Sequence, residues 1–268
     1  MNWFSGLILG IVQGLTEFLP VSSSAHLVFV PEILRVKAVP LPLAFDVALH
    51  LATLAAVLTY FYGDLRALLA GLFKNEPSSR GLIWLLVLGT IPAVTAGVIL
   101  KPVFALLKNP PLTACFMMIT GLALLWGDSL SNRGKTCREL RWFDAAWIGA
   151  AQALAVVPGI SRSGATIVAG LARGLSKKQA ARFSFLLSIP AICGAGLLES
   201  KDILGAQHLA VNPGTLAAGM IAAGVSGYLA IKYFLILLEK KSLRHFAYYC
   251  WIAGLAFLAY WYLANPRL

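Results

Sequence analysis

The sequence predicts an all-α integral membrane protein, with six transmembrane helices and two re-entrant helical hairpins arranged as an inverted repeat. Three observations predict this class: a very apolar composition, two polar runs that interrupt apolar segments, and an internal repeat. Of the 268 residues, 59% are hydrophobic and 12% are charged, and the mean hydropathy is +0.79. This composition is typical of membrane proteins and not of soluble domains. We therefore expect residues 1–268 to form a single membrane domain.

Six apolar stretches are long enough to cross a bilayer, which takes about 20 residues. They are residues 43–62, 81–100, 111–127, 183–198, 214–238 and 246–264. Aromatic residues stand near both ends of the last stretch: Tyr248, Tyr249 and Trp251 at one end, and Tyr260, Trp261 and Tyr262 at the other. Such clusters are typical of the two membrane–water interfaces, so this stretch is expected to span the full bilayer.

Two further apolar segments, residues 1–29 and 144–172, are each interrupted near the middle by a polar run. The first run reads QGLTEFLPVSSSAH and the second reads PGISRSGAT. Proline stops a helix, and the serines that follow it are good N-caps for a new one. Each segment is therefore predicted to form two half-helices. In the first, Gly6, Gly10 and Gly14 recur every four residues and are expected to permit close helix packing.

The distribution of basic residues indicates whether the interrupted segments cross the bilayer. If both turn back, four loops share one side of the membrane and hold fourteen Lys and Arg, against six on the other side. These loops are residues 63–80, 128–143, 173–182 and 239–245. If segment 144–172 crossed instead, the asymmetry would vanish. By the positive-inside rule we expect re-entrant hairpins, cytoplasmic basic loops and both termini outside.

An internal repeat explains why there are two such hairpins. Matching pairs at a shift of 138 residues include Pro20 with Pro158, Phe45 with Phe183 and Gly89 with Gly227, and Gln13 pairs with Gln152 after a one-residue slip. The two halves, residues 1–130 and 140–266, would each contain one hairpin and three spans, an odd number of crossings. They must then be inverted relative to one another, so that the hairpins enter from opposite faces and meet near the midplane.

The hairpin tips carry groups that suit a phosphate. Each half-helix start has free N–H groups and about half a positive charge, and Arg162 in the first turn of the later half-helix adds a planar guanidinium fork. Hydroxyl groups in the same region belong to Ser22, Ser23, Ser24, Ser161, Ser163 and Thr166. We expect these groups to bind a phosphate-bearing ligand. Hydroxyls in membrane spans also hydrogen-bond helix backbone, and that structural role is the alternative for Ser22, Ser24, Ser163 and Thr166.

The first hairpin adds groups that can perform chemistry. Gln13 and Glu17 are four residues apart and share a helix face, where an amide and a carboxylate can hold a divalent cation or position a proton. His26, about one turn into the next half-helix, can act as a base, an acid or a nucleophile. With Arg162 to stabilise developing charge, this is the inventory for phosphoryl transfer, with a serine or His26 attacking phosphorus.

These motifs resemble those of the undecaprenyl-diphosphate phosphatase family, also called bacitracin resistance proteins, and the similarity runs over essentially the whole chain. The matching residues are Gln13, Glu17, Pro20, Ser22, Ser23, Ser24 and His26 in the first motif, and Pro158, Gly159, Ser161, Arg162, Ser163 and Thr166 in the second. The segment FDVALH at residues 45–50 also resembles a family segment. Gln13 departs from the family by standing where Glu is frequent, and Ala25 replaces the usual glycine.

The resemblance implies a multi-pass enzyme of the bacterial inner membrane that hydrolyses undecaprenyl diphosphate to undecaprenyl phosphate and inorganic phosphate. This reaction recycles the lipid carrier of peptidoglycan synthesis and confers bacitracin resistance. The implied cofactor is a divalent cation, Mg²⁺ or Ca²⁺, held by Glu17 and Gln13, in a site that opens to the periplasm. The resemblance also implies Ser23 as the nucleophile, activated by Glu17 and His26, with a phosphohistidine at His26 as the alternative. Arg162 would act on the substrate phosphates.

Two other functional classes share some of these sequence features. A transporter or flippase of a prenyl phosphate lipid would also use inverted repeats and midplane anion sites, but it would release no phosphate. The acid-phosphatase-like lipid phosphatases need a Lys-x6-Arg-Pro motif, which is absent from the sequence.

The excess of basic residues is explained by cytoplasmic loops and anionic lipid headgroups. Membrane lipid and a prenyl diphosphate are therefore the expected partners, and nucleic acid is not. A homodimer stays open. Asp46 and His50, one turn apart, are expected to form a local pair beside the site.

Overall fold

The computed structural model describes residues 1–36, 41–130, 134–205 and 211–266. Within these ranges the regular structure is helical, apart from one isolated bridge between Lys135 and Leu175. The α-helices are α1 (Trp3–Phe18), α2 (Ser23–Ile33), α3 (Leu43–Tyr60), α4 (Tyr62–Phe73), α5 (Pro77–Leu100), α6 (Phe104–Leu107), α7 (Pro110–Ser129), α8 (Trp142–Leu154), α9 (Arg162–Ala172), α10 (Lys177–Gly205), α11 (Pro213–Lys240) and α12 (Arg244–Ala264). Two short 3₁₀ helices lie at Lys101–Val103 and Cys137–Glu139.

Six helices in the described part of the chain are long and apolar enough to cross a membrane, which confirms the predicted spans. They are Leu43–Tyr60, Pro77–Val103, Pro110–Ser129, Lys177–Glu199, Pro213–Leu238 and Arg244–Ala264. The largest difference is in α10, which begins six residues before the predicted 183. Hydropathy marks only the apolar centre of a span, whereas the helix continues into Lys177 and Lys178, since lysine favours helical conformation.

The two interrupted segments form two helices each, and their breaks lie where proline and serine predicted them. In the first, α1 ends at Phe18 and Ser22 is the N-cap of α2, with its side chain accepting from the Ala25 N–H. Ser22 has φ 67°, a conformation rare for serine. In the second, Ser161 caps α9 by accepting from the Gly164 N–H.

Gly159 stands at the turn before α9 for a backbone reason. Its φ is 99°, in the region that favours glycine, and a Cβ at this position would also overlap the backbone of Thr113. Glycine is therefore required here both by conformation and by the close approach of α7. The hairpin tip of α8 and α9 is held against α7 as a consequence.

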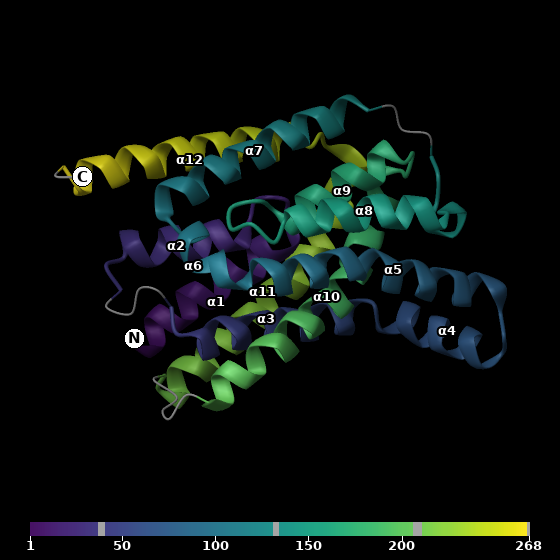
Figure 1. Ribbon diagram of the computed structural model, residues 1–268, viewed down its shortest axis with the longest axis horizontal. Helices are drawn as coiled ribbons and strands as arrows, with labels where there is room; N and C mark the ends of the chain where they lie inside the picture. Colours follow the sequence, from purple (N-terminus) through teal and green to yellow (C-terminus); the bar gives the residue numbers. More distant parts are fainter. Residues whose placement is uncertain (37–40, 131–133, 206–210, 267–268) are drawn as a thin grey trace.

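The two helical hairpins approach each other from opposite ends of the molecule (Figure 1). The hairpin of α1 and α2 opens toward the end where both chain termini lie, on the left of the view. The hairpin of α8 and α9 opens toward the other end, where the turn between α4 and α5 also lies. The tips of both hairpins therefore come together near the middle of the bundle. Lys37, Arg133 and Arg267, which belong to the basic-residue count, lie outside the described residues.

Close helix contacts fix the hairpins in the bundle. A Cβ added to Gly10 of α1 would overlap the backbone oxygen of Gly219 in α11, and a Cβ on Gly149 of α8 would overlap that of Gly89 in α5. The predicted use of Gly6, Gly10 and Gly14 for close packing is confirmed, because all three lie against α11. Each hairpin thus packs its first helix against a spanning helix of the other half of the chain.

Candidate active site

Hydroxyl groups join the two hairpin tips. The Gly159 N–H donates to Ser24 Oγ at 3.1 Å, and Ser163 Oγ donates to the backbone oxygen of Leu19 at 2.9 Å. Within each tip the serines also pair, Ser22 with Ser24 and Ser161 with Ser163, both at 3.1 Å. These bonds satisfy the polar groups of both turns and hold the starts of α2 and α9 in fixed register.

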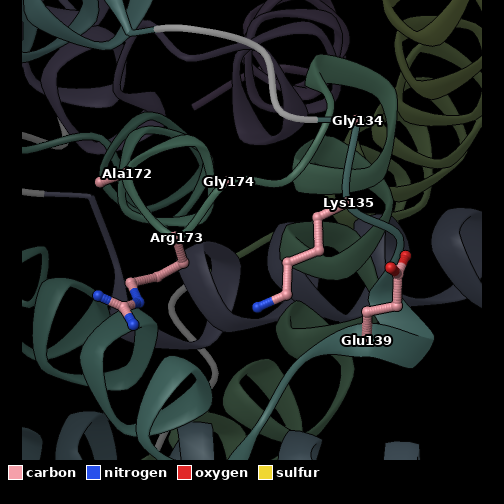
Figure 2. A pocket seen from close by; sticks show the side chains of 6 residues that line it. All are labelled: Gly134, Lys135, Glu139, Ala172, Arg173 and Gly174. Atoms are coloured by element: carbon pink, nitrogen blue, oxygen red, sulfur yellow. The ribbon is translucent and has the colours of Figure 1, made fainter.

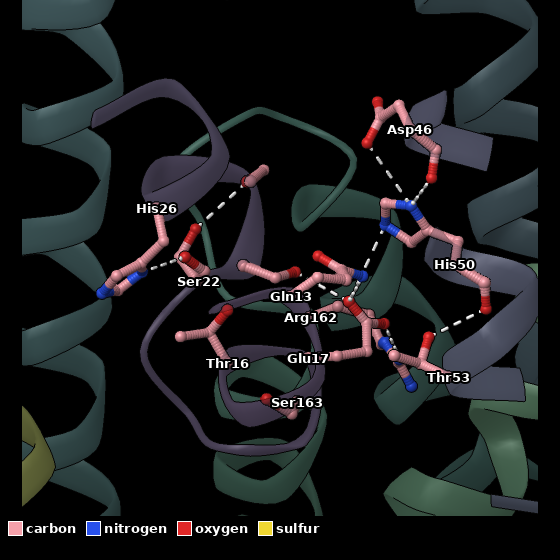
Figure 3. A network of polar contacts seen from close by, with 12 residues as sticks. Gln13, Thr16, Glu17, Ser22, His26, Asp46, His50, Thr53, Arg162 and Ser163 are labelled. Atoms are coloured by element: carbon pink, nitrogen blue, oxygen red, sulfur yellow. Dashed lines mark hydrogen bonds and ion pairs between the residues drawn. The ribbon is translucent and has the colours of Figure 1, made fainter. Parts of the chain in front are cut away.

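Glu17 is the centre of the polar cluster that the tips enclose (Figure 3). Its Oε1 accepts from Arg162 Nη2 at 2.6 Å. Its Oε2 accepts from Ser23 Oγ at 2.7 Å and from Gln13 Nε2 at 3.1 Å. The structure therefore brings together four of the predicted site residues, from both hairpins, around one carboxylate.

The Glu17–Arg162 pair is largely withdrawn from solvent, with exposed side-chain fractions of 6% and 17%. Burial of two charges is costly, and the pair is retained because each charge satisfies the other through a short hydrogen bond. Removing one partner of such a pair typically costs about 3–5 kcal/mol, since the remaining charge is left buried alone. The Glu17–Arg162 pair therefore both stabilises the contact between the two tips and contains the guanidinium expected to bind phosphate.

His50 of α3 also contacts Glu17, which the sequence did not reveal. Its Nε2 lies 3.7 Å from Glu17 Oε2, and its Nδ1 lies 2.9 Å from the backbone oxygen of Asp46, to which it donates. The local pair of Asp46 and His50 is present, with Nδ1 3.5 Å from the Asp46 carboxylate. The one-turn spacing could have suggested this pair, but only the packing of α3 directs the imidazole to the hairpin.

His26 faces away from this cluster. Its Nδ1 donates to the backbone oxygen of Ser22 at 2.8 Å, and its Nε2 accepts from the Tyr249 hydroxyl at 2.7 Å. Figure 3 shows the His26 ring on the opposite side of the tip from Glu17 and Arg162. Both ring nitrogens are thus engaged, and no hydrogen bond joins His26 to Ser23 among the described contacts. Tyr249, which the sequence placed in an interfacial belt, also directs its hydroxyl to His26 of the first hairpin.

The remaining predicted hydroxyls make structural bonds. Thr166 Oγ1 donates to the Arg162 backbone oxygen at 2.8 Å and lies 2.6 Å from Ser184 Oγ. Thr166, Ser161 and Ser163 are buried. Ser23 differs from these residues because its hydroxyl bonds to a carboxylate rather than to backbone. Among the predicted serine and threonine hydroxyls, that of Ser23 is the one that donates to Glu17 in the described part of the chain.

The oxygen atoms near Glu17 fit a divalent cation shared with a substrate. Gln13 is fully buried and its Oε1 has no partner among the described residues. Since amide orientation is assigned from hydrogen bonding, the oxygen can take the place that lies 3.1 Å from Glu17 Oε2. The Glu17 carboxylate, the Gln13 amide oxygen and the Ser23 hydroxyl would then be three neighbouring oxygen donors. Mg²⁺ typically uses one or two carboxylates together with substrate phosphates, so the donor set suits it.

A polar cavity of about 360 Å³ lies beside the C-terminal end of α9 (Figure 2). Its lining residues are Gly134, Lys135, Glu139, Ala172, Arg173 and Gly174. The buried carboxylate of Asp144 binds Lys135 Nζ at 2.9 Å and Arg173 Nε at 2.5 Å. Hydrogen bonds from the Thr136 hydroxyl and N–H lower the pKa of Glu139, which therefore stays charged. Lys135 and Arg173 are thus both paired with Asp144, and these contacts connect the loop before α8 to the end of α9. The cavity therefore has a structural role and offers little free charge to a ligand.

Comparison with known proteins gives a consistent result. A sequence model of the family described as bacitracin resistance protein BacA matches residues 6–256. An undecaprenyl-diphosphatase of Halothermothrix orenii is 44% identical over 256 residues, covering 95% of this chain and 96% of the relative. An undecaprenyl-diphosphatase of Alcanivorax borkumensis is also 44% identical, over 96% and 98% of the two chains. One of Methanosphaera stadtmanae is 40% identical over 95% and 96%.

Proposed function

The chain belongs to the bacitracin resistance protein BacA family, and from that premise we propose that it is an undecaprenyl-diphosphatase. It hydrolyses undecaprenyl diphosphate to undecaprenyl phosphate and inorganic phosphate, which returns the lipid carrier to peptidoglycan synthesis and gives bacitracin resistance. One observation supports this activity most directly. Glu17 binds the Ser23 hydroxyl at 2.7 Å and the Arg162 guanidinium at 2.6 Å, so a base, a nucleophile and an anion-binding fork meet at one point.

The proposed reaction begins with Ser23. Its Oγ attacks the terminal phosphorus while its proton passes to Glu17 Oε2, the atom that already accepts its hydrogen bond. The Oγ–phosphorus bond forms as the bond from phosphorus to the bridging oxygen breaks, and undecaprenyl phosphate leaves. Water then attacks phosphorus as the Oγ–phosphorus bond breaks: protonated Glu17 returns its proton to Ser23 Oγ, and the proton of the water leaves with inorganic phosphate. Arg162 stabilises the charge on the transferred phosphoryl group in both steps.

A divalent cation completes the proposed site. Glu17, Gln13 and Ser23 would hold Mg²⁺ or Ca²⁺ together with diphosphate oxygens. When bound, the cation neutralises charge on the diphosphate. Glu17 Oε1 binds Arg162, so Oε2 would both take the Ser23 proton and hold the cation, each on a separate lone pair. The remaining protein groups orient the phosphate by hydrogen bonds from the first turn of α9.

His26 has a positioning role in this proposal rather than the role of nucleophile. Its Nε2, the nitrogen available for attack, accepts the Tyr249 hydroxyl, and its Nδ1–H is bonded to Ser22. A phosphohistidine would require this contact with α12 to break and the ring to turn toward the cluster. Ser23 needs no such movement, which favours it over His26.

We also propose that the scaffold is an inverted repeat in the bacterial inner membrane, with its site open to the periplasm. Three correspondences support the repeat. Both tips are capped by serines and both carry a serine pair at 3.1 Å. Both first helices also have a buried glutamine, Gln13 and Gln152, whose oxygen has no partner in the described part of the chain. The basic loops belong to the end opposite the chain termini, as the turn between α4 and α5 illustrates in Figure 1.

Phosphate release from a prenyl diphosphate by the purified protein in detergent tests the proposed activity. We expect release that depends on added Mg²⁺ or Ca²⁺, stops with chelator, and is lost in Ser23→Ala. A protein that binds the lipid but releases no phosphate under any metal would contradict hydrolysis and favour the prenyl-phosphate flippase. Phosphate release that is undiminished in chelator would support the hydrolase activity but contradict the need for a divalent cation.

A further inference from the structure

We propose that His50 is a ligand of the divalent cation at Glu17, through its Nε2 atom. This inference rests on the proposed function, because it adds a residue to the cation site of that reaction. His50 belongs to α3, outside both polar motifs of the hairpins. Its place in the site depends on the packing of α3 against the first hairpin.

The hydrogen bond at Nδ1 fixes which nitrogen faces the site. Nδ1–H donates to the Asp46 backbone oxygen at 2.9 Å, so Nε2 is the nitrogen left to face the site. Nε2 lies 3.7 Å from Glu17 Oε2, where a protonated ring forms an ion pair with the carboxylate. The separation is too long for a hydrogen bond. When Nε2 gives up its proton, its lone pair faces the carboxylate oxygen, and a divalent cation can take the place of the proton between them.

The distance agrees with such an arrangement. Metal bonds of about 2.0–2.4 Å place neighbouring ligand atoms about 2.8–3.4 Å apart at right angles and about 3.3–3.9 Å apart at the tetrahedral angle. The 3.7 Å between Nε2 and Oε2 lies in the tetrahedral range. Ser23 Oγ and the Gln13 amide flank the same carboxylate oxygen, at 2.7 and 3.1 Å. His50 therefore adds one nitrogen to a group of oxygen donors.

The surroundings of His50 are those of a metal-bound imidazole. Such a histidine usually donates its second N–H to a backbone carbonyl or carboxylate, which fixes the ring and strengthens the bond to the metal. His50 has both groups at Nδ1: the Asp46 backbone oxygen at 2.9 Å and the Asp46 carboxylate at 3.5 Å. Lys108 lies 3.8 Å from that carboxylate on its other side and holds its charge.

A nitrogen ligand changes the expected metal preference. Ca²⁺ binds oxygen donors almost exclusively, whereas imidazole suits first-row transition metals. The protein should therefore bind Mn²⁺ or Co²⁺ more tightly than Ca²⁺. His50→Gln should reduce this preference more than it weakens Ca²⁺ binding.

Pulsed EPR of Mn²⁺ bound to the purified full-length protein tests the ligand directly. We expect ¹⁴N coupling in the wild type, its loss in His50→Gln, and Mn²⁺ affinity at least tenfold weaker in that variant. His245→Gln is the matched control, because His245 also donates Nδ1–H to a backbone oxygen, that of Ser242, yet lies at the start of α12 and apart from Glu17. Its spectrum should equal that of the wild type.

The outcomes separate this inference from the proposed reaction. Wild-type Mn²⁺ without ¹⁴N coupling, or coupling unchanged in His50→Gln, would overturn the role of His50. Phosphate release from a prenyl diphosphate by the same wild-type sample would show that the hydrolase stands regardless. His50→Glu guards against a variant that fails to fold: it should retain Mn²⁺ through oxygen while lacking ¹⁴N coupling.

Discussion

Glu17 and Arg162 lie 2.6 Å apart although they are separated by 145 positions in the chain. Each comes from a different hairpin, Glu17 from the end of α1 and Arg162 from the first turn of α9. Neither hairpin alone contains both the base and the guanidinium. The site therefore exists only where the two tips meet, and a change at either tip affects both binding and folding.

Arg162→Lys keeps the positive charge but removes the planar fork. We expect kcat/KM to fall by at least about a hundredfold, as when one preorganised donor to a reacting oxyanion is lost. The protein should still purify as a folded species, because lysine can still pair with Glu17. Activity within threefold of the wild type would contradict a bidentate contact with phosphate.

Ser23 and Ser24 are adjacent, but they should respond differently to alanine. Ser23→Ala removes the nucleophile, so turnover should fall by at least about a thousandfold. Ser24→Ala removes the acceptor of the Gly159 N–H, so it should lower the free energy of unfolding by about 1–3 kcal/mol. Thermal unfolding in detergent and phosphate release, measured on both variants, separate the two effects. Reversed effects would assign the nucleophile to Ser24.

Tyr249→Phe removes only the hydroxyl that His26 Nε2 accepts. We expect the free energy of unfolding to fall by about 1 kcal/mol and the reaction of His26 with diethyl pyrocarbonate to become faster, since its lone pair is released. Tyr248→Phe is the matched control, because Tyr248 is exposed on the same helix. Equal reaction rates in wild type and Tyr249→Phe, followed by peptide mass spectrometry, would argue against this contact.

Gly10→Ala should destabilise the protein by about 1–3 kcal/mol, because its Cβ would overlap the backbone oxygen of Gly219 and crowd Ala222. Gly63→Ala serves as the control, since nothing lies within 4 Å of a Cβ at that position. Alanine there should be neutral or slightly stabilising. Thermal unfolding of both variants in detergent measures the difference, and equal stability would exclude tight contact between α1 and α11.

The proposed orientation can be tested with single cysteines in a chain whose four native cysteines are replaced by serine. Ser78, in the first turn of α5, and Pro266, beyond α12, are both exposed. A membrane-impermeant maleimide added to intact spheroplasts should label Pro266→Cys and not Ser78→Cys. Both should react once the membrane is permeabilised. Labelling of Ser78→Cys alone in intact spheroplasts would reverse the orientation.

The local features of the hairpins could be predicted from the sequence, because they depend on neighbouring residues. Pro20 follows the end of α1 at Phe18, and Ser22 and Ser161 cap the next helices as serine does elsewhere. The position of Arg162 in the first turn of α9 follows from the same rule. The order of helices along the chain was equally accessible, because long apolar stretches decide it.

The directions of side chains between helices could not be predicted in this way. His26 bonds to Tyr249 of α12, and His50 of α3 approaches Glu17, and both contacts depend on how distant helices rotate about their axes. Nothing in the spacing of Asp46 and His50 reports that rotation. The hydroxyls of Ser24 and Ser163 likewise bond across the two tips, because the meeting of the hairpins creates partners that neither motif contains.

The glycine-lined contact between α1 and α11 also constrains how the protein is made. Because α1 precedes α11 in the chain, the surface against which Gly10 packs is present only after Pro213–Lys240 has been synthesised. Until then α1 lacks the helix that covers its glycine face. A chain that ends shortly before Pro213 would therefore contain Glu17, Ser23 and Arg162 but lack the helix that fixes α1 in the bundle.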